Sequence, residues 1–89
     1  MDRAEATAIL DAHLEPFRRR SHAELQALMG DVHVAEVSGR SGAEYQIEVE
    51  VVWDSPREQA DIRVLGAIDD GLLPSAMAPV TRDFIVRRE

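Results

Sequence analysis

The ten residues Glu44–Trp53, EYQIEVEVVW, carry the clearest structural pattern in this chain. Apolar side chains occupy every second position from Tyr45 to Trp53, and the positions between them are polar until Val52 breaks the alternation. Alternation with period two is typical of a β-strand that has one buried and one solvated face. The stretch also holds the only tyrosine and the only tryptophan of the chain. We therefore expect it to be a central strand that lies over the core.

The residues after this stretch predict the strand that pairs with it. Residues 54–60, DSPREQA, are polar and contain a proline, which indicates a hairpin loop. A strand over 61–69 would then pair antiparallel and align the two apolar faces. The expected pairs are Trp53 with Ile62, Val51 with Val64, Val49 with Gly66, and Ile47 with Ile68. Gly66 leaves space that either a helix side chain or a small ligand would fill.

A weaker alternation precedes the central strand. Residues 31–38 predict a first strand, and the turn SGRSGA over 38–43 joins it to the central one. Val32 and Val34 share one face of this strand. His33 lies on the other face, and we expect it to point away from the core.

The end of the sheet is predicted from a turn. Asp69-Asp70-Gly71 favours a type I′ hairpin, because both central residues of that turn need positive φ. A fourth strand over 72–78 would follow, and it belongs at the sheet edge because Pro74 cannot donate to a ladder. Residues 83–86 predict either a closing strand or a docked tail.

Two helices are expected before the strands. Residues 2–15 begin with an Asp2/Glu5 pair that resembles a capping box, and Pro16 should end or kink the helix. Its apolar stripe consists of Ala6, Leu10, His13, Leu14 and Phe17. A cleaner capping box, SHAE, opens a short helix over 21–29. The fold class is therefore α+β, with two N-terminal helices packed on one face of a four-stranded antiparallel meander sheet, in a single domain over residues 1–89.

Composition narrows the functional classes. The net charge of −7 argues against nucleic acid as a partner, because phosphate binding needs a positive surface. The chain has no cysteine and no lysine, so cysteine nucleophiles, Schiff-base lysines and P-loop lysines do not apply. The opening MDRAEATAIL is unlike a secretory signal, and no apolar run approaches the roughly 20 residues of a membrane span. We expect a soluble cytoplasmic protein with no cofactor and no bound metal.

A helical N-terminus followed by an antiparallel meander is similar in architecture to cystatin-like folds, in which a sheet curls around a helix. The resemblance is one of fold and transfers no activity. It implies that a ligand would sit between the first helix and the concave sheet face. The candidate pocket residues there are His13, Tyr45, Trp53 and Gly66.

A second candidate site is for an anion. Arg18, Arg19 and Arg20 directly precede Ser21, which opens the second helix. Guanidinium groups and a helix N-terminus both favour a phosphate or a carboxylate. The alternative is that these arginines pair with acidic neighbours, of which the chain has many.

The third candidate is a homodimer interface on the sheet face opposite the helices. The predicted register places these small or apolar side chains there: Val52, Leu65, Ala67, Leu72, Ala76 and Ala78. Glu48 and Glu50 keep the rest of this face solvated, and an apolar patch of this kind typically marks an interface. A register shift of one residue, or coverage by the C-terminal residues 84–86, would remove the patch. The expected function is a non-enzymatic protein-interaction module acting as a homodimer, with a small-ligand or enzymatic pocket as the alternative.

Overall fold

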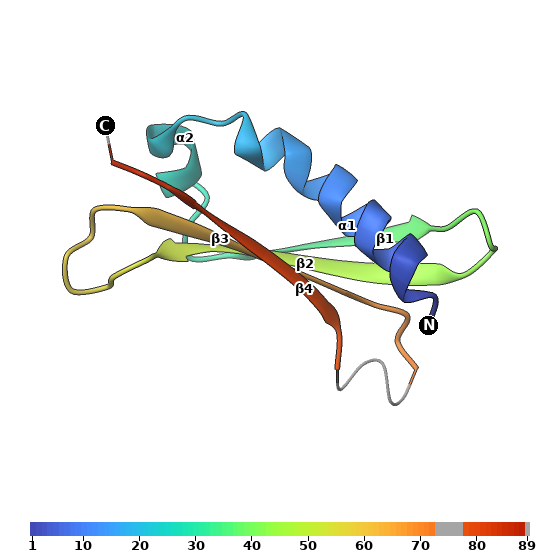
Figure 1. The fold of residues 1–89 in the computed structure, drawn as a ribbon. Helices are drawn as coiled ribbons and strands as arrows, with labels where there is room; N and C mark the ends of the chain where they lie inside the picture. The colour runs from blue at the N-terminus through green and yellow to red at the C-terminus, as the bar shows by residue number, and fades with distance from the viewer. Residues whose placement is uncertain (73–77, 89) are drawn as a thin grey trace.

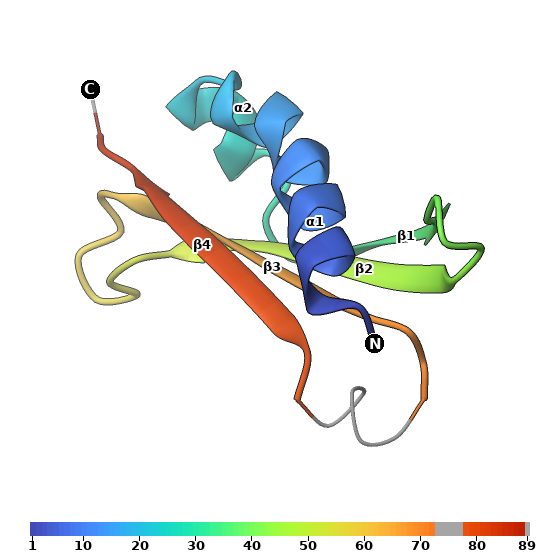
Figure 2. The same ribbon diagram turned by 45° about the vertical axis from the view of Figure 1, so that its right-hand side comes forward.

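The computed structural model describes residues 1–72 and 78–88, which form a two-layer α+β arrangement (Figure 1). The elements are α1 (Arg3–Arg18), α2 (His22–Gln26), β1 (Val32–Ser38), β2 (Glu44–Trp53), β3 (Ile62–Asp69) and β4 (Val80–Val86). The strands form one antiparallel sheet in the order β1-β2-β3-β4. Both helices lie on the same side of it (Figure 2). The predicted fold class is confirmed.

Strand β2 lies inside the sheet, between β1 and β3, and its apolar side chains face the helices. Tyr45 is 2% exposed and the alternate residues up to Val51 are at most 1% exposed, while Trp53 is half-buried. The β2–β3 register contains all four predicted pairs, from Trp53 with Ile62 to Ile47 with Ile68. Alternation and turn length were sufficient to fix this pairing, because a slip of one residue would turn the apolar set toward water.

The helices close the core through leucines. Leu10 and Leu14 of α1 and Leu25 of α2 are fully buried. A Cβ on Gly66 would lie 3.0 Å from Leu14 Cδ1 and 3.1 Å from Leu10 Cδ1. The two leucines therefore occupy the space that the glycine leaves, and α1 approaches β3 closely because residue 66 has no side chain.

Helix α1 extends past the proline that was expected to end or kink it. Its N-terminus has half of the predicted capping box: Asp2 Oδ1 accepts a hydrogen bond from the Glu5 backbone N–H at 3.0 Å, but the Glu5 carboxylate bonds to Ser41 and Tyr45. Pro16 lies inside the helix, which ends at Arg18. The ring removes one backbone donor near the C-terminus. Phe17 packs against the core one residue later, and we infer that this contact compensates for the missing hydrogen bond.

Helix α2 is shorter than predicted. The capping box is complete: Ser21 Oγ accepts from Glu24 N at 3.1 Å, and Ser21 N donates to Glu24 Oε1 at 3.0 Å. The α-helix ends at Gln26, after which Leu28 N donates to Leu25 O at 2.9 Å. This three-residue spacing is a tighter 3₁₀-type turn. The apolar positions after the helix still pack on the core.

The fourth strand was misplaced in the sequence prediction. Strand β4 begins at Val80, and it pairs with β3 from Ile68–Val80 to Ile62–Val86. The closing-strand interpretation of residues 83–86 is therefore confirmed. The expected strand over 72–78 is wrong at its described ends, since Leu72 and Ala78 lie outside the sheet. Residues 73–77 lie outside the described part of the chain.

The turn after β3 also differs from the prediction. Asp69 Oδ1 accepts from Gly71 N at 2.7 Å, and Asp70 Oδ1 accepts from Leu72 N at 3.0 Å. Gly71 has a φ of 76°, but Asp70 is not among the residues with positive φ. A type I′ turn needs both, so the two aspartate side chains form Asx turns in its place.

Strand β1 presents its valines to solvent. Val32 pairs with Glu50 and Val34 with Glu48, so both valines share the outer face and are 53% and 56% exposed. His33 faces the helical layer, where its Nε2 lies 3.1 Å from Leu28 O. The expectation that His33 points away from the core is wrong, because its partner is the buried Val49.

Candidate functional site on the outer sheet face

The sheet face opposite the helices is a candidate surface that neither helix covers (Figure 2). The cross-strand pairs define one row as Val34, Glu48, Ala67 and Thr81. The next row is Val32, Glu50, Leu65 and Asp83. The third is Val52, Arg63 and Ile85. Since α1 and α2 both lie on the other face, these side chains are available to a partner (Figure 2).

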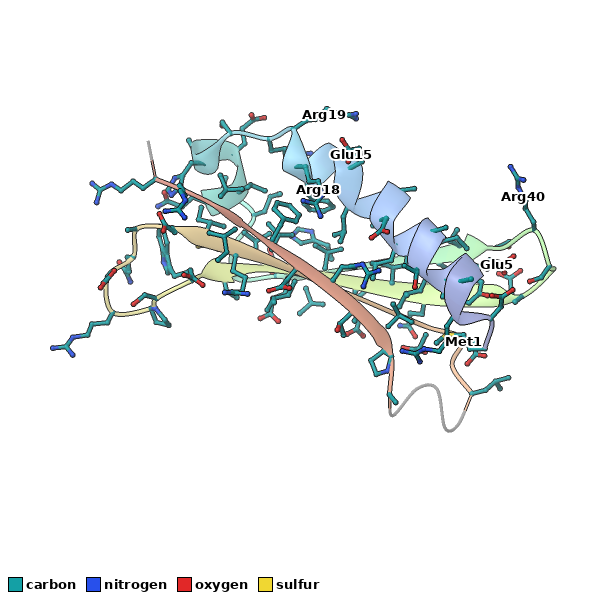
Figure 3. The ribbon with its side chains drawn as sticks, in the orientation of Figure 1. Met1, Glu5, Glu15, Arg18, Arg19 and Arg40 are labelled. Carbon is teal, nitrogen blue, oxygen red and sulfur yellow. The ribbon has the colours of Figure 1, made fainter. Side chains whose placement is uncertain are left out.

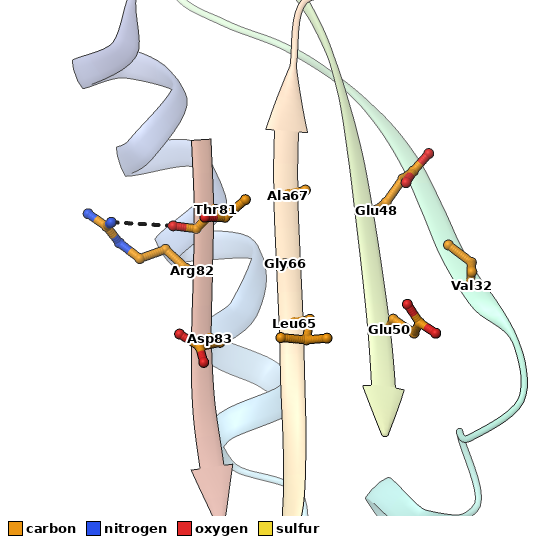
Figure 4. Close-up of a pocket in the computed structure, with 9 residues that line it drawn as sticks. All are labelled: Val32, Glu48, Glu50, Leu65, Gly66, Ala67, Thr81, Arg82 and Asp83. Carbon is orange, nitrogen blue, oxygen red and sulfur yellow. Dashed lines mark hydrogen bonds between the residues drawn. The ribbon is translucent and has the colours of Figure 1, made fainter. Parts of the chain in front are cut away.

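The middle of this face is hollowed. A depression of ≈ 390 Å³ spans all four strands. Figure 4 shows its lining side chains in front of the helices. They are Val32, Glu48, Glu50, Leu65, Gly66, Ala67, Thr81, Arg82 and Asp83. Leu65 is 37% exposed at its centre and forms an apolar floor with Ala67.

The charges on this face are unevenly compensated. Arg63 forms ion pairs with Asp54, at 2.8 Å, and with Asp83. The hydrogen bond to Asp54 is the main reason that the pKa of Arg63 is raised. Glu48 and Glu50 have only apolar residues opposite them, and no ion pair or hydrogen bond involves either carboxylate in the described part of the chain. The hollow therefore combines an apolar floor with two uncompensated negative charges.

The predicted interface residues divide into three groups. Val52, Leu65 and Ala67 lie on the outer face as expected. Leu72 and Ala78 are exposed but stand outside the sheet, and Ala76 lies outside the described residues. Three further apolar side chains on this face were not predicted, and all are exposed: Val32, Val34 and Ile85. The pairing of β1 with the buried positions of β2 would have assigned the two valines to this face.

The four candidate pocket residues contact different partners. The Tyr45 hydroxyl donates to Glu5 Oε1 at 2.8 Å. The His13 ring lies 6.3 Å from the Phe17 ring, and the Trp53 ring lies 6.0 Å from that of His22. The space beside Gly66 is filled by α1 leucines. The structure thus places these residues in separate packing environments along the core.

A polar cluster around Glu5 was not predicted from the sequence. Its carboxylate accepts hydrogen bonds from Ser41 Oγ at 2.7 Å, from Ser41 N at 3.1 Å and from the Tyr45 hydroxyl. The Ser41 hydroxyl is the main cause that lowers the pKa of Glu5, and the Tyr45 hydrogen bond adds to it. Burial, and then the bond to Glu5, raises the pKa of Tyr45 to about 12. The cluster joins the start of α1 to the β1–β2 turn, and its signal in sequence was only the capping role of Glu5.

The candidate anion residues are engaged within the chain. The Arg18 guanidinium lies 4.3 Å from the centroid of the Phe84 ring, and Arg20 lies 4.0 Å from Glu24. Ser21 bonds to Glu24, whose carboxylate occupies the N-terminus of α2. Figure 3 shows Arg19 pointing away from the sheet and Arg18 pointing toward it. The three guanidinium groups do not converge on one point.

No protein-family model matches the chain, and searches of the curated proteins and of the solved structures gave no match. Within residues 1–72 and 78–88, no helix has the length and apolar character to cross a membrane.

Proposed function

We propose that this protein is a non-enzymatic interaction module that acts as a homodimer and contacts another protein through its outer sheet face. The observation that carries the proposal is the uncovered outer face, with its apolar floor and two uncompensated carboxylates. An apolar surface that no other layer covers is typical of an interface.

The charges of the outer face indicate the chemistry of the other protein. Packing this face against itself would bring Glu48 and Glu50 of both copies into one interface. Removing a carboxylate from water costs free energy, and the cost is large when no positively charged partner replaces the water. A partner with apolar side chains interspersed with arginine or lysine would fill the hollow and neutralise the same two charges. The face therefore suits a basic, amphipathic segment better than a second copy of itself.

The pocket alternative has less support. Leu10 and Leu14 fill the space beside Gly66, where a ligand was the alternative occupant. The outer face has exposed apolar side chains, among them Val34, Leu65 and Ile85, and the two unpaired carboxylates.

The outer face is tested with a model ligand, a peptide in which leucine and arginine alternate. Calorimetry would measure its binding to the native protein and to the variant Glu48→Gln/Glu50→Gln. The matched control is Glu15→Gln/Glu58→Gln, which removes the same charge from exposed positions in α1 and in the β2–β3 loop. We expect at least about tenfold weaker binding for the first variant, because two charge-assisted contacts are lost, and no comparable change for the control. Equal weakening in both variants would show that the peptide responds only to net charge, and would contradict the proposal.

A further inference from the structure

We infer that the exposed edge of β1 is the self-association site, and that two copies join there as antiparallel strands into one continuous eight-stranded sheet. This inference deepens the homodimer of the proposed function and rests on it. It assigns the second copy to an edge, and so leaves the outer face free for the other protein.

Every second residue of β1 has backbone N–H and C=O groups that do not bond to β2. Gly39 N donates to Ala43 O at 2.8 Å, continuing the β1–β2 ladder beyond Ser38. In an antiparallel ladder the bonded residues alternate, so the odd-numbered residues of β1 bond to β2. The N–H and C=O groups of the even-numbered residues therefore point away from the sheet. These residues are Val32, Val34, Glu36 and Ser38.

The two edges of the sheet differ in protection. Strand β1 has no proline, and Glu36 is its only acidic or arginine residue, so it presents a long and nearly uncharged edge. Strand β4 follows Pro79 and contains Arg82 and Asp83. Arg82 Nη1 also donates to Thr81 O at 3.5 Å (Figure 4). Charges and prolines are the usual means of blocking an edge, and β1 lacks them where β4 has them.

Symmetry restricts how two β1 strands can pair. An antiparallel pair related by a two-fold axis places residue i opposite j and j opposite i. Directly opposed side chains share a face, so i and j must both be even or both be odd. The helices of both copies then lie on the same face of the joined sheet. Full overlap of the seven residues of β1 places Ala35 opposite its own copy.

This register is compatible with the charges of the strand. Val34 lies opposite Glu36 of the second copy, and Val32 lies opposite Ser38, so no like charges are directly opposed. The neighbouring register, in which residue 36 lies on the two-fold axis, would place Glu36 opposite Glu36 of the second copy. In this register the end of β1 that follows Asp31 lies beside the end that precedes Arg40 in the other copy, which brings opposite charges to the same end of the pair. For a chain with a net charge of −7, this edge is a favourable place for two copies to meet.

The helical layer leaves room for the second copy beside β1. Helix α1 makes most of its sheet contacts with β3 and β4, and the core-side residues Ala35 and Val37 are only half-buried. A hollow of ≈ 480 Å³ lies between α1 and the end of β1, lined in part by Ala8, Ile9 and Ala12. In the joined sheet each hollow lies beside the Val32 end of the other copy's β1, because Ser38 is opposite Val32. Apolar α1 side chains from both copies would then cover the central β1 strands.

Cysteine crosslinking tests the inference, because the native chain has no cysteine. Ala35→Cys would place two thiols in a non-hydrogen-bonded pair, with Cα atoms about 4.5 Å apart, within the range for a disulfide. Ala67→Cys is the matched control, since Ala67 is also a half-buried alanine of the sheet but lies on the outer face. We expect rapid intermolecular disulfide formation for Ala35→Cys under mild oxidation, and none for Ala67→Cys at the same concentration.

The other outcomes separate the two proposals. Crosslinking through Ala67→Cys alone would overturn the edge inference and leave a homodimer that forms through the outer face. A dimeric native protein in which neither variant crosslinks would also overturn the edge inference while sparing the homodimer. A monomeric native protein would overturn both.

A second pair of variants needs no oxidation. Asp54 N donates to Asp61 O at 2.8 Å, which shows that the odd-numbered residues of β3 bond to β2. The even-numbered residues of β3 therefore bond to β4, and they pair with even-numbered residues there. The N–H of Thr81 therefore points outward from β4 as that of Val34 does from β1. Val34→Pro should weaken self-association about tenfold or more, because it removes a donor at both symmetric positions, whereas Thr81→Pro should leave it unchanged.

Amide exchange of the native protein gives the same test without substitution. The outward amides of β1 should be protected at high-micromolar concentration and those of β4 should not, and equal exchange at both edges would contradict the inference.

Discussion

The contact between Gly66 and α1 gives the sharpest prediction about stability. In Gly66→Ala the new Cβ would lie 3.0 and 3.1 Å from the two Cδ atoms of Leu14. These distances are a few tenths of an ångström below ordinary contact, so the leucine must shift. Overpacking of this kind costs about 1–3 kcal/mol. The lower entropy of the unfolded alanine chain offsets about 0.4–1 kcal/mol of that cost. We expect a net loss of about 1 kcal/mol.

The partner substitution is Leu14→Ala. It removes a fully buried side chain and leaves a cavity, which costs about 3 kcal/mol. It also removes two of the three methyl groups that crowd residue 66, the third being Leu10 Cδ1 at 3.1 Å. In the double variant the alanine Cβ at 66 fills part of the new cavity. The double variant should therefore lose about 3 kcal/mol, less than the sum of about 4 kcal/mol, giving a coupling of about 1 kcal/mol.

Urea unfolding followed through Trp53 fluorescence measures this cycle, with m-values checked for constancy. The control pairs Gly66→Ala with Leu25→Ala, a fully buried leucine of α2 that is not among the nearest neighbours of residue 66. That pair should be additive within about 0.5 kcal/mol. If Gly66→Ala and Leu14→Ala were also additive, the space beside Gly66 would not be filled by Leu14, and the pocket interpretation would regain support.

Two further predictions concern polar contacts. Tyr45 is the only tyrosine, so phenolate absorbance should titrate near 12 in the folded protein and near 10 in denaturant. Because the unfolded chain releases this proton first, the contribution to stability is complete below pH 10 and is lost as pH rises toward 12. Glu5→Gln should move the folded value down toward 10, and an unchanged titration would argue against the Glu5–Tyr45 bond. Ser21→Ala removes the N-cap of α2 and should cost about 1 kcal/mol in urea unfolding. A loss near zero would mean that α2 is held by Leu25 packing alone.

The inner half of the sheet was predictable from sequence because its pattern and its burial agree. In β2 the alternation of Ile47, Val49 and Val51 with glutamates specifies a face, and β3 continues it across a polar loop. A slip of one residue would turn one apolar face toward water, and the length of the loop selects among the remaining registers. The helices were located by their caps, Asp2 and Ser21, whose side-chain hydrogen bonds are observed.

The edges were harder to predict because local signals there compete with tertiary packing. The Asp-Gly signal after β3 indicated a tight hairpin, but the aspartate side chains satisfied the turn differently and the fourth strand begins at Val80. Pro16 signalled a helix end that the packing of Phe17 outweighs. The faces of β1 depend on its pairing with β2, which its own residues do not encode.

The candidate surface was partly predictable for the same reason. Val52, Leu65 and Ala67 follow from the β2–β3 register. Ile85 required the true position of β4, and Val32 and Val34 required the β1 register. The Glu5 cluster joins residues 36 to 40 positions apart, a distance over which sequence spacing carries no signal.

The most direct test of the proposed function is the solution mass of the unmodified chain across a range of concentrations. Sedimentation equilibrium should give a mass that rises to twice the chain mass of 9.9 kDa by high-micromolar concentration and then stays constant, as a closed dimer requires. A mass of one chain throughout that range would contradict the homodimer, and with it the assignment of the β1 edge.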